Sequence, residues 1–147
     1  RNDKVEIIKS KISSMETEWA DRINSIIQKF REKKDILDIM VNVYDYILLV
    51  NREIIKTSVA IAELSKKMKE KKYMYLIDIK TNSDFIIKNN SELGIMLENK
   101  MKEIDQYYDL LNTHKVFLEN ILVLLKDILF GVKNYIDYLK ITNQQIS

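Results

Sequence analysis

The chain has no cysteine and no proline, and its 147 residues include only two glycines and one histidine. The absence of cysteine excludes disulfides, thiolate nucleophiles and thiolate metal sites. Loops that cradle phosphates need clustered glycines, whereas Gly94 and Gly131 stand far apart, so nucleotide hydrolysis is not expected. The absence of proline removes the residue that most strongly interrupts a helix.

The single histidine, His114, excludes most metal and nucleophilic centres. A di-iron or di-manganese carboxylate bundle needs two Glu-x-x-His elements, but the residue three positions before His114 is Leu111. Zinc sites with several imidazoles are excluded by the same count. A serine–histidine–aspartate centre would need a glycine-flanked serine, which the chain lacks. We therefore expect no catalytic residues, no cofactor and no metal, and we interpret His114 as a partly exposed helix residue.

Neither charge of one sign nor a long apolar run dominates the sequence. The 24 basic and 22 acidic side chains nearly cancel, so no specific nucleic-acid binding is expected. The richest apolar runs, residues 36–50 and 121–132, both contain charged residues. They fall short of the roughly 20 consecutive apolar residues that a membrane span needs. We therefore expect no membrane span in this chain.

What the sequence does have is apolar residues at helical spacing over tens of residues. Two ladders of this kind advance by three or four positions at each step, which keeps their members on one side of a helix. The first ladder is Val5, Ile8, Ile12, Met15, Trp19, Ile23, Ile26 and Phe30, and the second is Ile104, Tyr108, Leu111, Lys115, Leu118, Leu122, Leu125, Leu129, Val132, Ile136 and Leu139. The pattern predicts long helices packed side by side.

The first helix is expected from about Asp3 to Arg31, and Asp35 is expected to cap a second helix. Between them, the basic cluster at residues 31–34 interrupts the apolar pattern, which favours a turn. The heptad phase nevertheless continues through this cluster, so one unbroken helix over residues 4–70 stays open as the alternative. The fold would then be a long two-helix coiled-coil hairpin with apolar surface left for a second chain.

Residues 36–50 are apolar almost all round, so we expect this stretch to be contacted on more than one side and to form the deepest part of the core. Asp45 lies among tyrosines there, and we expect it to be partly buried and satisfied by a tyrosine hydroxyl or by Lys126. Residues 73–91 hold the densest turn formers and predict a short helix or an irregular connector. A final helix is expected from about residue 91 to residue 141.

Together these patterns predict a single all-α domain over residues 1–147. Its architecture is expected to be an elongated antiparallel helical bundle of three long helices, with a shorter helix or irregular connector between the second and third. At this length the chain is long enough to bury a continuous core without disulfides or metals.

Such a pattern specifies an architecture rather than a chemistry, so the expected function is non-enzymatic. We predict a helical scaffold or protein-interaction module whose partner is another protein or a second copy of the chain. The candidate partner-binding residues lie where a second basic cluster is followed by two tyrosines, a residue type enriched at protein interfaces. They are Lys69, Lys71, Lys72, Tyr73 and Tyr75.

Two other functions stay open from the sequence. One is an exported subunit of a secretion or DNA-transfer (conjugation) apparatus. Because the chain begins at Arg1 rather than methionine, we expect an upstream piece to have been removed, either as a signal peptide or by the choice of fragment. A periplasmic or extracellular location is accordingly favoured over a cytoplasmic one. The other function is a small-ligand carrier with a pocket inside the bundle, lined by Tyr44, Ile47, Leu122 and Leu125.

Overall fold

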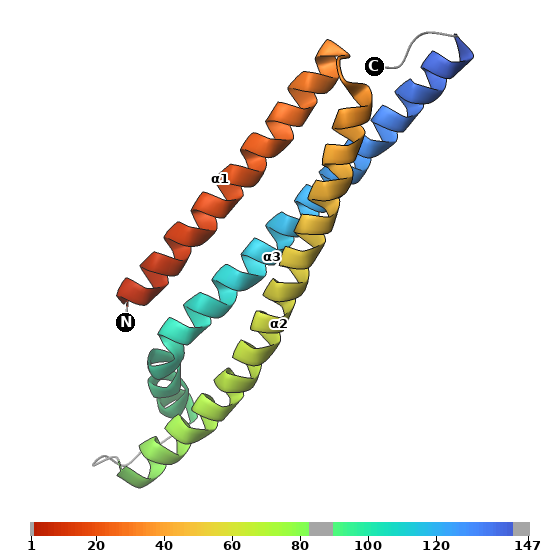
Figure 1. Cartoon of the computed structure of the whole chain (residues 1–147). Coiled ribbons are helices and arrows are strands. Elements are labelled where there is room, and N and C mark those ends of the chain that lie inside the picture. The colour runs from red at the N-terminus through yellow and green to blue at the C-terminus, as the bar shows by residue number, and fades with distance from the viewer. Residues whose placement is uncertain (1, 83–89, 143–147) are drawn as a thin grey trace.

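The computed structural model of the chain describes residues 2–82 and 90–142. Over these residues three helices follow one another, α1 (Asn2–Glu32), α2 (Ile36–Asn82) and α3 (Asn90–Ile141), and there is no strand. Each helix runs antiparallel to the one before it (Figure 1), and the most extensive packing is between α2 and α3. The predicted all-α bundle of three long helices is confirmed. Within the described residues, no helix has a segment long and apolar enough to cross a membrane.

The turn between α1 and α2 forms at the basic cluster, so the unbroken helix and the two-helix hairpin are both wrong. The backbone is left-handed at two residues other than glycine, Lys33 (φ 57°) and Asp35 (φ 52°). The amide and the ammonium group of Lys33 each donate a 3.1 Å hydrogen bond to the carbonyl oxygen of Phe30, which satisfies the end of α1. The carbonyl oxygen of Asp35 accepts the amide of Ile39 at 3.0 Å, the first bond of α2.

Lys33 also ties this turn to α3. Its ammonium nitrogen lies 4.1 Å from the ring centroid of Phe30 and 5.0 Å from that of Tyr135. The two rings meet edge to face at 6.1 Å between centroids. A left-handed residue other than glycine costs about 1–2 kcal/mol. These cation–π and aromatic contacts offset part of that cost.

The prediction of an irregular connector is wrong for residues 73–82, because α2 continues to Asn82. Ile79 is buried, and it lies eleven positions after Met68, which is three helical turns. The burial of this apolar face outweighs the weak helix propensity of the residues near the end of α2. The described residues therefore contain no separate fourth element, and residues 83–89 of the expected connector lie outside them.

The core lies where the three helices meet, and Trp19 is its largest fully buried side chain. Its ring meets the ring of Tyr46 on α2 edge to face, with 5.8 Å between centroids. The guanidinium carbon of Arg22 lies 4.7 Å from the centroid of the same indole. Apart from Ile121 of α3, the other members of the buried cluster come from the two ladders and the first half of α2. The members are Ile23, Ile26, Ile36, Ile39, Val43, Val50, Leu118, Ile121, Leu125, Val132 and Ile136.

His114 is the one buried polar side chain among the described residues, and it joins α3 to α1. The expectation of partial exposure is wrong, since the residue is only 4% exposed. Its Nδ1 lies 2.9 Å from Oε2 of Glu16. Because a carboxylate only accepts, the imidazole N–H donates this bond. The imidazole also stacks on Phe117, with 6.4 Å between ring centroids.

Replacing Glu16 by alanine is expected to lower the free energy of unfolding by about 1–3 kcal/mol, because the buried imidazole N–H loses its acceptor. Urea unfolding followed by circular dichroism measures the change. The matched control is Glu18→Ala, since the Glu18 carboxylate pairs at 2.7 Å with Arg22 on an exposed surface of the same helix. Losing that pair should cost about 0.5 kcal/mol or less. Equal losses for the two variants would contradict a structural role for the pair of Glu16 and His114.

At Gly131, inside α3, a substitution is expected to stabilise the fold. A methyl group added there would lie 3.6 Å from Cε2 of Phe30, an ordinary van der Waals contact. Because alanine is favoured over glycine in a helix interior by about 1 kcal/mol, Gly131→Ala should raise the free energy of unfolding by that amount. Gly131→Val should lose most of the gain, since a β-branched residue is a poorer helix former. A lower melting temperature for the alanine variant would contradict the prediction.

Residues 36–50 are buried on one side of α2 and exposed on the other. The buried side carries Ile36, Ile39, Val43 and Val50, whereas the opposite side exposes Leu37, Val41, Tyr44 and Leu48. The stretch therefore belongs to the core as predicted, but the described chain does not cover it all round. Asp45 lies on the exposed side, so the expectation that it is partly buried is wrong.

A candidate partner-binding cleft

Beyond the start of α1, the other two helices continue together as a two-helix arm, defined here as residues 62–82 and 90–105 (Figure 1). Near the beginning of α1, Val5 shares a surface groove with Leu110 and Thr113 of α3. The first helix therefore starts beside a part of α3 that follows the arm.

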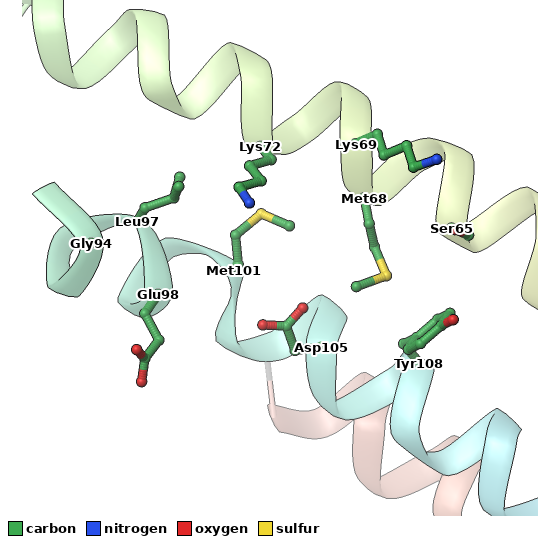
Figure 2. Close-up of a pocket in the computed structure, with 10 residues that line it drawn as sticks. All are labelled: Ser65, Met68, Lys69, Lys72, Gly94, Leu97, Glu98, Met101, Asp105 and Tyr108. Atoms are coloured by element: carbon green, nitrogen blue, oxygen red, sulfur yellow. The ribbon is translucent and has the colours of Figure 1, made fainter. Parts of the chain in front are cut away.

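A cleft of about 510 Å³ lies between the two helices of the arm (Figure 2). The side chains of Met68 and Met101 reach into it from facing helices. The space beside Gly94 is open, since a Cβ added there would meet nothing within 4 Å. The lining residues are Ser65, Met68, Lys69 and Lys72 from α2, and Gly94, Leu97, Glu98, Met101, Asp105 and Tyr108 from α3. The volume is in the range of about 300–1,000 Å³ that is common for binding pockets.

Charges of both signs line the cleft. The ammonium group of Lys72 points toward Met101, and the carboxylate of Asp105 points toward α2, whereas Glu98 points away from α2 (Figure 2). Over the residues that the structure describes, Lys69, Lys72 and Asp105 have no ion-pair partner. These three groups are therefore available to a molecule that enters the cleft.

The structure brings together only part of the predicted partner-binding set. Lys69 and Lys72 line the cleft, whereas Lys71 and Tyr73 are exposed on α2 and do not line it. Tyr75 lies further along the arm, and its ring centroid is 5.6 Å from the ammonium nitrogen of Lys100 on α3. Tyr73 and Tyr75 thus lie on the same regular helix as the lysines, not on the irregular segment that the sequence predicted for residues 73–91.

The α3 side of the cleft was missed by sequence reasoning. Tyr108 is an ordinary member of the second apolar ladder, and nothing nearby in the sequence distinguishes Met101 or Asp105. Met68 and Met101 lie far apart in the sequence, so only the tertiary structure shows that they line the same cleft. Thioether side chains are flexible and polarisable, so they adapt to the shape of a bound partner.

The four residues expected to line a pocket inside the bundle occupy other positions. Leu125 is fully buried in the core cluster, and Ile47 and Leu122 pack against it. Tyr44 is exposed, and its ring centroid is 5.5 Å from the ammonium nitrogen of Lys133. The side chains that were to surround a small ligand therefore fill the core or lie on the surface.

Two further findings bear on the chemistry. Among the described residues, no group of three histidine, aspartate or glutamate side chains is placed to hold a metal ion. Comparison with known proteins found no family model, no curated protein and no solved structure that matches the chain.

Proposed function

We propose that this protein is a non-enzymatic helical module that binds another protein through the cleft of the arm. The observation that carries the proposal is a cleft with an apolar floor, formed by the half-buried Met68 and the buried Met101, between rims of unpaired charge. An apolar centre with a charged rim is the common arrangement of protein-interaction sites. The three-helix body would hold this arm in place for the partner.

The cleft favours a partner segment of defined chemistry. One or two large apolar side chains of an amphipathic helix or loop would fill the space between the two methionines. Lys69 and Lys72 on one helix favour an acidic residue beside that anchor, and Asp105 on the other helix favours a basic one. The partner segment is therefore expected to carry charges of both signs around an apolar centre.

Photo-crosslinking in cells that produce the protein tests the proposal. A photoreactive amino acid in place of Met68 is expected to form an adduct with a partner protein. The same substitution at Val116, an exposed residue of α3 outside the arm, is expected to form none. Lys72→Glu should reduce the adduct about tenfold, which corresponds to roughly 1.4 kcal/mol. Lys126→Glu, an exposed lysine of α3 outside the cleft, should not reduce it.

Two results would contradict the proposal. One is the absence of any protein adduct at Met68 when the variant is folded by circular dichroism. The other is the same set of adducts at Met68 and at Val116, because non-specific contact with the arm would explain it.

A further inference from the structure

Six exposed apolar residues of α2 lie along one side of the helix, and we call them the stripe: Leu37, Val41, Tyr44, Leu48, Ile55 and Val59. They follow one another by 4, 3, 4, 7 and 4 positions, so they lie on one side of the helix over about six turns. Their exposed fractions range from 42% to 65%. The sequence predicted contact all round this part of α2, and the stripe is the side that the described chain leaves uncovered.

The stripe is large enough to form an interface. Soluble monomers rarely expose a contiguous apolar patch of more than a few hundred Å². At these exposed fractions roughly 100 Å² of each stripe residue is open to solvent, about half of what a large aromatic side chain buries. Complete burial of the stripes of two copies would remove at most roughly 1,200 Å² from water, which reaches the lower end of the range for stable interfaces.

The charge along one edge of the stripe changes sign halfway. Asp38 and Asp45 occupy this edge in the first half, and Arg52 and Lys56 continue it in the second half by further helical steps. All four side chains are exposed. In the described part of the chain none of the four has an ion-pair partner. Each half of the edge therefore has the charge that would attract the other half in a second copy.

We infer that the stripe is a self-association surface, on which a second copy of this chain packs its own stripe in antiparallel orientation about a two-fold axis near Leu48. In this arrangement Leu37 lies near Val59 of the second copy. Asp45 faces Arg52 of the second copy, and the symmetry forms this ion pair twice. In a parallel two-fold dimer, the edge that carries Asp45 and Arg52 would instead meet the opposite edge of the second copy, so the ion pair of Asp45 with Arg52 would not form. The order of charges therefore selects the antiparallel dimer.

This surface is separate from the cleft, so the inference does not depend on the proposed function. Sedimentation equilibrium of the full chain over a range of concentrations measures the Kd of the dimer. We expect the unmodified chain to dimerise and Leu48→Lys to raise the Kd about 100-fold. The axis places two lysines in each dimer, and each is expected to weaken association about tenfold.

The matched control is Val123→Lys, because Val123 of α3 is 57% exposed and Leu48 is 64% exposed. The control variant should keep the Kd of the unmodified chain. Circular dichroism of both variants establishes that they are folded. A monomeric unmodified chain at every concentration would overturn the inference. So would a Leu48→Lys variant that dimerises as tightly as the control.

A charge exchange tests the orientation. Asp45→Arg alone places the new guanidinium against Arg52 of the second copy twice and should raise the Kd about tenfold or more. The double variant Asp45→Arg with Arg52→Asp restores the attraction only in the antiparallel dimer, so its Kd should return to within about threefold of the original. A double variant as weak as the single one would overturn the antiparallel arrangement.

Discussion

Replacing Trp19 by alanine is expected to lower the free energy of unfolding by about 3–5 kcal/mol, the usual cost of truncating a fully buried tryptophan. The indole is only 1% exposed and contacts Tyr46 of α2 edge to face. Its removal would leave a cavity between α1 and α2, and the Arg22 guanidinium would lose the ring that it covers. A loss of this size is a large fraction of the 5–15 kcal/mol that usually stabilises a domain.

Urea unfolding of the Trp19→Ala variant, followed by circular dichroism, measures this loss. Ile7→Ala is the matched control on the same helix, because Ile7 is 58% exposed. The control should cost about 0.5 kcal/mol or less. A loss for Trp19→Ala that is no larger than the control would mean that α1 does not pack through this residue.

The second large effect is expected at Leu125, where substitution by alanine should cost about 3 kcal/mol. This leucine of α3 is fully buried in the cluster to which all three helices contribute. Because packed interiors relax only partly around a missing side chain, most of the cavity would stay open. The variant should unfold at a lower urea concentration. The slope of its free energy of unfolding against urea concentration should stay unchanged.

The neighbouring leucine provides the control for this prediction. Leu124 is 45% exposed on the same helix, so Leu124→Ala removes the same atoms from a surface position. Its expected cost is below about 1 kcal/mol. Similar losses for the two adjacent leucines would show that the register of α3 in the bundle differs from the one described.

The two proposals together describe a bridging protein. In the antiparallel dimer the two arms point in opposite directions, because each is an extension of α2 and α3 beyond α1. The clefts therefore lie at opposite ends of the dimer. Such an assembly would hold two partner molecules apart at a set distance, and binding both would be favoured by multivalency.

The long helices were predictable from local physics. Apolar residues recur every three or four positions in both ladders, and neither proline nor clustered glycine interrupts them. The turn at residues 33–35 was also predicted, because a basic cluster there interrupts the apolar face. The end of α2 was not, since polar residues near position 81 favour a turn locally, and only the burial of Ile79 shows that the helix continues.

The candidate site was only partly predictable. Lys69 and Lys72 were found because they are clustered in the sequence, but their α3 neighbours Met101 and Asp105 come from the far side of a connection. The buried pair of His114 and Glu16 was missed for a similar reason, since its members are 98 positions apart. Helical periodicity states which residues share a side of one helix, and it contains no information on which other helix that side meets.

The sequence by itself determined that the chain forms long helices and which apolar sides could be buried, and it favoured a turn at the basic cluster over one unbroken helix. Hydrogen bonding and side-chain periodicity within each helix are local, so neighbouring residues suffice to specify them. Only the tertiary structure decided that the helix breaks between α1 and α2, that His114 is buried, and which side of α2 stays exposed. Those features depend on the relative lengths and positions of packed helices, which are set by contacts between residues far apart in the chain.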